Sequence, residues 1–153
     1  GYNIIHAWPE LKALAVDNLE GARFRLLDMM CNYQGYKKCL LIVVFDAYKV
    51  KQNLGTSEQY HNIHVVYTKE SQTADMYIER VTHEMASQYH MTVATSDALE
   101  QLIITGAGAY RMSARELKQD LERLNREKQS NYSSQQPKSH NYLLEDIRNF
   151  KNE

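Results

Sequence analysis

The run Cys39-Leu-Leu-Ile-Val-Val-Phe45, followed directly by Asp46, indicates the fold class of this chain. An uninterrupted apolar run with several β-branched residues is typical of a strand that is covered on both faces. The shorter runs Ile63–Tyr67 and Met91–Thr95 predict two more strands. Strands that are buried in this way occur in parallel sheets with helices packed on either side. We therefore expect an α/β fold.

The segments around these strands have the apolar spacing of helices. This spacing predicts helices over roughly 18–34, 73–89, 97–104 and 113–128. Ser96 is the expected N-cap of the third helix, and Ser113 and Glu116 form a capping box at the fourth. Helices and strands therefore alternate along the chain, which is the pattern of a parallel sheet with helices on both of its faces.

Length and composition indicate one globular domain. The chain has 153 residues, of which 43% are hydrophobic, and its net charge is −1. This charge excludes a strongly basic nucleic-acid binder but leaves room for a local basic patch. The longest apolar run is too short to span a bilayer and no signal peptide opens the sequence, so we expect a cytoplasmic protein without membrane association. The expected organisation is a domain over 1–128, a polar linker over 129–139 and a C-terminal helix or tail over 140–153.

The two cysteines, Cys31 and Cys39, have no metal-binding spacing. Both lie in or beside apolar stretches, so we interpret them as buried, reduced thiols, which suits the cytoplasm. The Gly106-Ala-Gly108 turn does not follow a predicted strand and lead into a helix in the manner of a dinucleotide-binding motif. We interpret it as a bend, and no nucleotide cofactor is expected.

Three aspartates fall at matching places in the predicted sheet. Asp46 directly follows the first strand, Asp97 follows the last, and Asp75 lies in the first turn of the helix after the second. The carboxyl ends of parallel strands share one edge, where ligands bind. Clustered carboxylates need a cation, and oxygen ligands suit Mg²⁺ or Mn²⁺, which favours phosphodiester hydrolysis. The alternative, that each aspartate only stabilises a helix start, stays open.

Several motifs occur in a definite order along the chain: Gly1-Tyr-Asn-Ile-Ile5, Val43-Val-Phe-Asp46-Ala47, Thr73-Ala-Asp75, Ala94-Thr-Ser-Asp97 and 106–117. Together they resemble the successive blocks of the YacP-like NYN-domain family, a branch of the PIN-like ribonucleases. The resemblance covers roughly residues 1–123 and rests on the order and spacing of the motifs. Each motif alone is weak, but the series is specific.

The resemblance implies a PIN-like three-layer α/β/α sandwich with a central parallel sheet. It also implies an endoribonuclease dependent on Mg²⁺ or Mn²⁺, acting in bacterial RNA processing or messenger decay, with ribosome-associated messenger RNA among its partners. By motif match, Asp46, Asp75 and Asp97 would be the catalytic metal ligands. Asn3 would support them as a further catalytic residue, and Thr95 and Ser96 would line the same edge and contact RNA.

Four cations are candidates for contact with RNA phosphates. Arg111 and Arg115 lie near the start of the last long helix, and Lys49 and Lys69 lie in loops at the expected active edge. For the two arginines, a solvated helix face with pairing to nearby acids such as Glu122 is an equally open interpretation. The competing function is a non-catalytic RNA- or ribosome-binding module on the same fold, whose binding would survive Asp97→Asn.

The family motif is Asp-Gly-Tyr-Asn at the end of the first strand, whereas this sequence begins at the glycine. We expect that the leading aspartate and its strand lie upstream of Gly1. This strand would belong in the middle of the sheet, and its absence would expose two strand edges and remove a metal ligand. The 153 residues alone are therefore expected to be less stable than the extended form, and inactive.

Extension of the chain by about eight upstream residues, the length of a typical strand, that end in aspartate should raise both stability and activity. The added strand would pair both edges, and the added carboxylate would complete the metal site. Thermal unfolding and an RNA-cleavage assay on the two forms measure these gains. The expectation is wrong if neither quantity increases.

Overall fold

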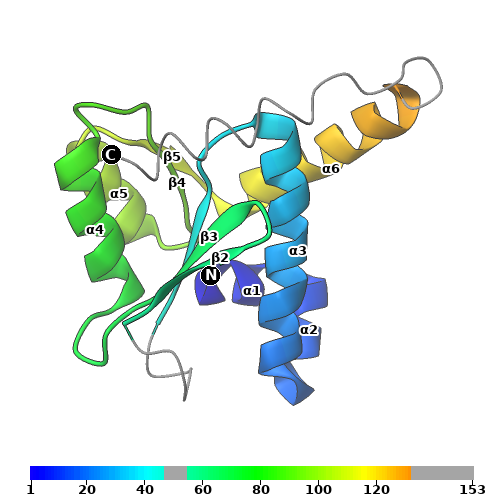
Figure 1. The fold of residues 1–153 in the computed structure, drawn as a ribbon, viewed down its shortest axis with the longest axis horizontal. Coiled ribbons are helices and arrows are strands. Elements are labelled where there is room, and N and C mark those ends of the chain that lie inside the picture. Colours follow the sequence, from blue (N-terminus) through cyan, green and yellow to red (C-terminus); the bar gives the residue numbers. More distant parts are fainter. Residues whose placement is uncertain (47–54, 132–153) are drawn as a thin grey trace.

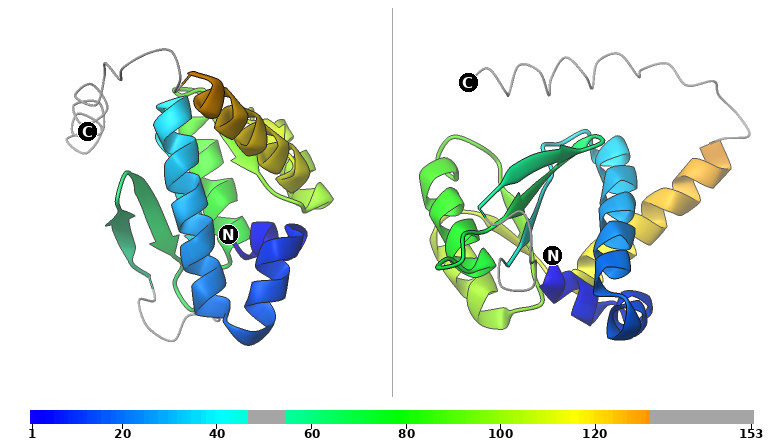
Figure 2. Two further views of the ribbon diagram at one scale, coloured as in Figure 1. Left: turned by 90° about the vertical axis from the view of Figure 1, so that its right-hand side faces the viewer. Right: turned by 60° about the horizontal axis from the view of Figure 1, so that its bottom comes forward.

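The computed structural model describes residues 1–46 and 55–131. The described chain forms three layers, with strands between two groups of helices (Figure 1). One group comprises α4 (Ala74–Met85) and α5 (Ala98–Gly106). The other comprises α1 (Tyr2–Ala7), α2 (Pro9–Asp17), α3 (Leu19–Lys37) and α6 (Ala114–Asn131). Figure 2 shows α1 and α2 beside the first turns of α3, with α6 crossing α3 at an angle.

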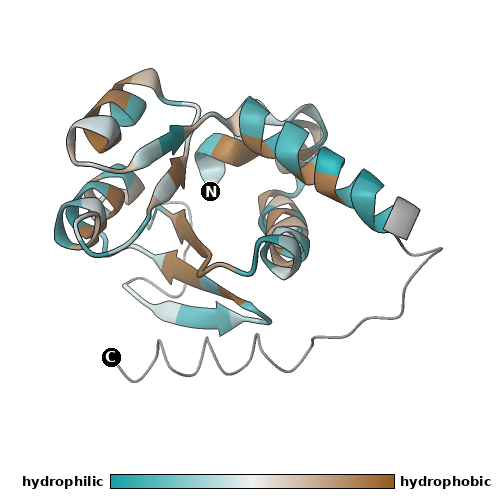
Figure 3. Ribbon diagram, turned by 90° about the horizontal axis from the view of Figure 1, so that it is seen from above, coloured by the Kyte–Doolittle hydropathy of each residue, from teal (hydrophilic) through white to brown (hydrophobic). Residues whose placement is uncertain are grey.

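The first sheet has the strand order β1-β3-β2. Its β1–β3 pair is parallel, with Val43 of β1 (Ile42–Phe45) opposite Val65 of β3 (Ile63–Tyr67). Both strands are mostly buried and apolar, as their sequences predict (Figure 3). The edge strand β2 (Ser57–Tyr60) is antiparallel to β3 and hydrophilic, so its sequence pattern did not predict a strand.

The second sheet pairs β4 (Thr92–Ala94) with β5 (Tyr110–Met112) in parallel. Within the described residues no strand joins β1 to β4, so the expected central sheet consists of two separate parts. The backbone nitrogen of Gly1 donates a hydrogen bond to the carbonyl oxygen of Val44 at 2.6 Å, on β1. The start of the chain therefore lies against the first sheet. Gly1, Val44 of the first sheet and Ala94 of the second sheet all line one pocket.

The four predicted helices are all present, with small corrections at their ends. The N-cap of α5 is Asp97 rather than Ser96, and the Ser113–Glu116 capping box at α6 is confirmed by its two reciprocal hydrogen bonds. Residues 129–131 continue α6 instead of starting the linker, because no glycine or proline interrupts the helix there. The rest of the expected linker and the C-terminal segment lie outside the described residues.

Two further expectations concern burial. Cys31 and Cys39 are free thiols, but neither is fully buried. Cys31 is half-buried, and Cys39 is exposed because β1 begins only at Ile42 and leaves Cys39 in the preceding loop. Among residues 1–46 and 55–131, no helix has both the length and the apolar character needed to cross a membrane.

The bend between α1 and α2 is anchored by Trp8, whose side chain is buried in the main core. Its indole Nε1 donates a hydrogen bond to the carbonyl oxygen of Ala114 at 2.8 Å. Since Ala114 is the first residue of α6, this bond joins the beginning of the chain to its last described helix. Pro9 then starts α2 at a position where a helix needs no backbone donor.

Replacement of Trp8 by phenylalanine should lower the free energy of unfolding by about 1–3 kcal/mol, because the hydrogen bond is lost and the smaller ring leaves a gap. Urea unfolding followed by circular dichroism measures this change. Val16→Ala, at an exposed position of α2, is the control and should change stability by less than about 0.5 kcal/mol. Equal stability of the Trp8→Phe and Val16→Ala variants would contradict the anchoring role.

Candidate active site

A cavity of about 220 Å³ lies at the carboxyl ends of β1 and β4. Its walls come from the start of the chain, from both sheets and from the first turns of α4 and α5. The lining residues are Gly1, Tyr2, Asn3, Ile4, Val44, Asp46, Ala74, Asp75, Ile78, Ala94, Thr95 and Glu100. The edge of the strands at which the sequence predicted a site is therefore hollow. The acidic side chains that line this cavity are Asp46, Asp75 and Glu100.

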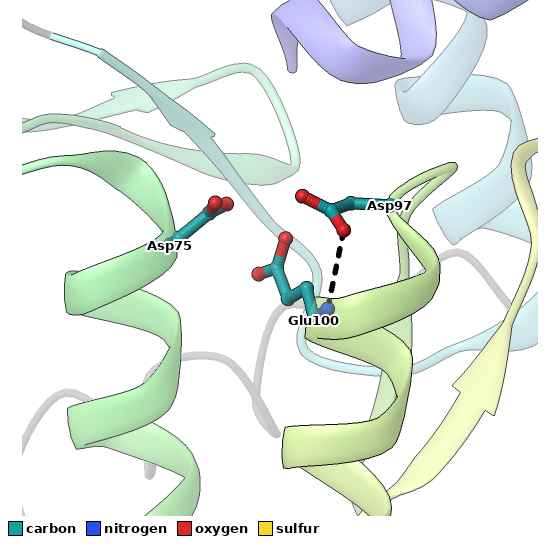
Figure 4. Close-up of side chains that lie close together, drawn as sticks. All are labelled: Asp75, Asp97 and Glu100. Carbon is teal, nitrogen blue, oxygen red and sulfur yellow. Dashed lines mark hydrogen bonds between the residues drawn. The ribbon is translucent and has the colours of Figure 1, made fainter.

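Three carboxylates converge at this place. Asp75, Asp97 and Glu100 each offer an oxygen atom, and these oxygens all lie within 4.8 Å of one another. Asp75 extends from the first turn of α4 toward the other two, which come from the start of α5 (Figure 4). Asp75 is exposed, Asp97 is half-buried and Glu100 is buried, so the cluster runs from the surface into the protein.

The cluster is held in place by helix capping. Oδ1 of Asp97 accepts hydrogen bonds from the backbone nitrogens of Leu99 at 2.9 Å and Glu100 at 3.3 Å. Its other carboxylate oxygen points toward Asp75 (Figure 4). Asp97 therefore caps α5 and takes part in the cluster, so the two interpretations drawn from the sequence are compatible at this residue.

Glu100 is the acidic residue of the cluster that sequence reasoning missed. Its side chain is 3% exposed, and Oε2 accepts a hydrogen bond from Thr95 Oγ1 at 3.2 Å. Oε1 is buried and has no hydrogen-bond partner among the described residues. The signal that could have found it is its spacing, since it lies three positions after Asp97, about one helix turn further along the chain.

The environment of Glu100 favours its protonated form. Burial, together with the carboxylates of Asp75 and Asp97, raises the pKa of Glu100 to about 8, although the hydrogen bond from Thr95 acts in the opposite direction. A buried carboxylate oxygen next to two more carboxylates is a donor set that suits a hard divalent cation. The residues present therefore fit Mg²⁺ or Mn²⁺.

Asp46 lies at the expected edge of the strands, beside the three close carboxylates. It lines the same cavity but lies outside the group of three close carboxylates. Its Oδ1 accepts a hydrogen bond from the backbone nitrogen of Ala74 at 2.6 Å, which fixes the first residue of α4. This contact positions the helix that carries Asp75, and direct binding of a metal by Asp46 stays a prediction.

The supporting residues Asn3 and Thr95 line the cavity, and Ser96 follows Thr95 in the chain. Oδ1 of Asn3 accepts hydrogen bonds from the backbone nitrogen and the hydroxyl group of Ser96, which links α1 to the loop before α5. The Thr95 hydroxyl group donates to Glu100 and accepts from the backbone nitrogen of Asp97 at 3.1 Å. These bonds leave the loop that carries Asp97 little freedom. Contact of Thr95 and Ser96 with RNA stays a prediction.

The cations predicted to bind RNA do not line the cavity within the described residues. Arg111 on β5, Arg115 on the first turn of α6 and Lys69 after β3 are all exposed. Neither arginine forms an ion pair with an acidic side chain of the described chain, so pairing of the kind proposed with Glu122 is not observed there. Lys49 lies outside the described residues. Contact of these four cations with RNA stays a prediction.

Comparison with known proteins adds to this geometry. The sequence matches the model of the YacP-like NYN domain over residues 1–153. YacP of Bacillus subtilis (strain 168) is 46% identical over 129 residues, which are 82% of this chain and 74% of that protein. The crystal structure of Rae1 (YacP) from Bacillus subtilis has a TM-score of 0.72 at 41% identity, covering 86% of this chain and 76% of that one. Its W164L mutant has a TM-score of 0.74 at 38% identity, covering 96% and 86%.

The raised pKa of Glu100 predicts how stability depends on pH. The folded value of about 8 lies above the ordinary value of 4.5, so the folded protein retains a proton that the unfolded chain releases. This contribution is complete below about pH 4.5 and is lost as the pH rises through about 8. The melting temperature of the metal-free protein should therefore decrease as the pH is raised from about 4.5 to about 8. In the Glu100→Gln variant this decrease should be smaller.

Mg²⁺ or Mn²⁺ added at pH 8.5 should raise the melting temperature of the unmodified protein by several degrees but that of Glu100→Gln much less, because binding stabilises only the folded state. Thermal unfolding with and without chelator measures both effects. Glu84→Gln, at an exposed position of α4, is the matched control and should behave like the unmodified protein. An unchanged pH dependence in Glu100→Gln would contradict this account of the site.

Proposed function

This chain belongs to the YacP-like NYN domain family, and on that premise we propose that it is a metal-dependent endoribonuclease that hydrolyses RNA phosphodiester bonds. The family implies a nuclease-like function related to RNA. The observation that carries the proposal is the cluster of Asp75, Asp97 and Glu100, in which a buried oxygen of Glu100 has no partner in the described chain. Such a donor set suits the cation on which phosphodiester hydrolysis depends.

Asp75, Asp97 and Glu100 would hold Mg²⁺ or Mn²⁺, which when bound polarises a phosphate group and lowers the pKa of an attacking water. Asp97 is restrained by its capping bonds, and Glu100 is restrained by burial and by Thr95. Both therefore keep their geometry before a substrate arrives, which lowers the cost of organising the site during the reaction.

A polymer substrate would place only one linkage in the cavity. The cavity volume of about 220 Å³ is below the range of about 300–1,000 Å³ that encloses a small-molecule ligand, so it suits one linkage of a strand. Exposed Asp75 marks the side from which this linkage would enter, and buried Glu100 marks the floor. We infer an action on cytoplasmic RNA in processing or messenger decay, with messenger RNA on the ribosome as the expected substrate.

Asp75→Asn and Glu100→Gln should each lower the rate of RNA cleavage at least about 100-fold, because each removes a charge from the metal site. Cleavage of structured and unstructured RNA is measured with Mn²⁺, with Mg²⁺ and with chelator. Both the 153-residue chain and the form extended upstream by an Asp-terminated strand are tested. Glu84→Gln is the control that should retain the rate.

Two outcomes would overturn the proposal in different ways. Equal cleavage by Asp75→Asn and the unmodified sequence would refute the site. Binding of RNA by both forms, without cleavage and without dependence on a divalent cation, would instead identify a non-catalytic RNA-binding module.

A further inference from the structure

A half-buried arginine lies next to the candidate active site. Arg23 belongs to the second turn of α3, and its Nη1 donates a hydrogen bond to the hydroxyl oxygen of Tyr2 at 3.2 Å. Tyr2 lines the cavity that contains the acidic cluster. The guanidinium group is therefore connected to the wall of the cavity through a single side chain.

This connection is part of an aromatic row. The ring of Tyr2 packs on Phe45 with centroids 5.1 Å apart, and Phe45 stacks on Tyr67 at 5.8 Å. Burial and the charge of Glu58 raise the pKa of the Tyr67 hydroxyl group. The nearby charge of Arg23 acts in the opposite direction and lowers this pKa. The three rings are buried, so Tyr2, which accepts the hydrogen bond from Arg23, is itself held in place by packing.

Within the described residues Arg23 has no acidic partner, in contrast to half-buried Lys118 and exposed Lys37. Lys118 pairs with Glu10 at 2.5 Å, and Lys37 pairs with Asp120 at 3.2 Å. No ion pair joins Arg23 to an acidic side chain within residues 1–46 and 55–131. A cation that is partly removed from water without a compensating charge is costly, and an anionic ligand would offset that cost.

We propose that Arg23, oriented by Tyr2, binds a backbone phosphate of the RNA strand next to the linkage held at the acidic cluster. This inference rests on the proposed function and adds the direction of the strand, which would leave the cavity over Tyr2 toward α3. A guanidinium group carries five N–H donors, and the bond to Tyr2 uses one of them. The remaining donors match the geometry of phosphate oxygens.

The test measures RNA binding in the absence of cleavage. All proteins carry Asp75→Asn, and a fluorescent single-stranded RNA is titrated by anisotropy at several KCl concentrations. Arg23→Gln should weaken binding about three- to tenfold near 0.1 M salt and should reduce the slope of log affinity against log salt by about 0.7, the value for one lost phosphate contact. Arg23→Lys should retain the slope because it keeps the charge.

Two matched variants keep the result interpretable. Arg25→Gln removes the same charge from an exposed position two residues along α3 and should leave affinity and slope unchanged. Tyr2→Phe removes only the hydroxyl acceptor, so it should weaken binding about twofold without a change of slope. Equal salt slopes for Arg23→Gln and Arg25→Gln would overturn the inference, even if the nuclease proposal holds.

The two proposals fail separately. Suppose that Arg23→Gln weakens binding specifically, but that neither the 153-residue chain nor the extended form cleaves RNA. This result would support the phosphate contact and overturn the nuclease activity. Cleavage that depends on Asp75, together with an Arg23→Gln variant that binds as the control does, would support the nuclease and overturn the phosphate contact. Absence of RNA binding in every variant would overturn the phosphate contact, while the cleavage assay on the unmodified sequence still decides the nuclease proposal.

Discussion

Repulsion among Asp75, Asp97 and Glu100 is the constraint on which the rest of the site depends. Three carboxylate oxygens within 4.8 Å, one of them buried, destabilise the fold unless protons or a cation compensate them. The structure provides partial compensation, because two of the acids lie at the first turn of a helix, where the backbone N–H groups and the helix dipole favour negative charge. The pKa of about 8 for Glu100 shows that this compensation is incomplete.

The start of the chain holds the two halves of the molecule around this cluster. Gly1 bonds to Val44 in the first sheet, Asn3 bonds to Ser96 beside the second sheet, and Trp8 bonds to Ala114 at the beginning of α6. Residues 1–8 therefore contact β1, the loop after β4 and the last described helix within a short length of chain. One wall of the cavity is built from this segment, so the geometry of the acids depends on how it packs.

Charge in this protein is organised locally and not over the whole surface. A net charge of −1 conceals an acidic centre and a nearby arginine that has no acidic partner in the described chain. A metal ion held at the acidic centre would attract phosphate, and so would the guanidinium group of Arg23, which contacts the cavity wall through Tyr2. The ring of Tyr2 packs on Phe45, which in turn stacks on Tyr67. This arrangement suits a strand that is held at successive phosphates.

The amino-acid sequence by itself determined the parallel pair of strands, four helices and the convergence of Asp75 with Asp97, because apolar periodicity and capping residues act over short distances along the chain. It did not predict β2 or β5, since short polar strands are stabilised by their partners. In the sequence Glu100 looks like an ordinary acid of a first helical turn. Its burial and its closeness to Thr95 and Asp75 follow only from the tertiary structure. The contacts from Asp46 to Ala74 and from Arg23 to Tyr2 were likewise decided by the tertiary structure, because each joins residues that are distant in the sequence.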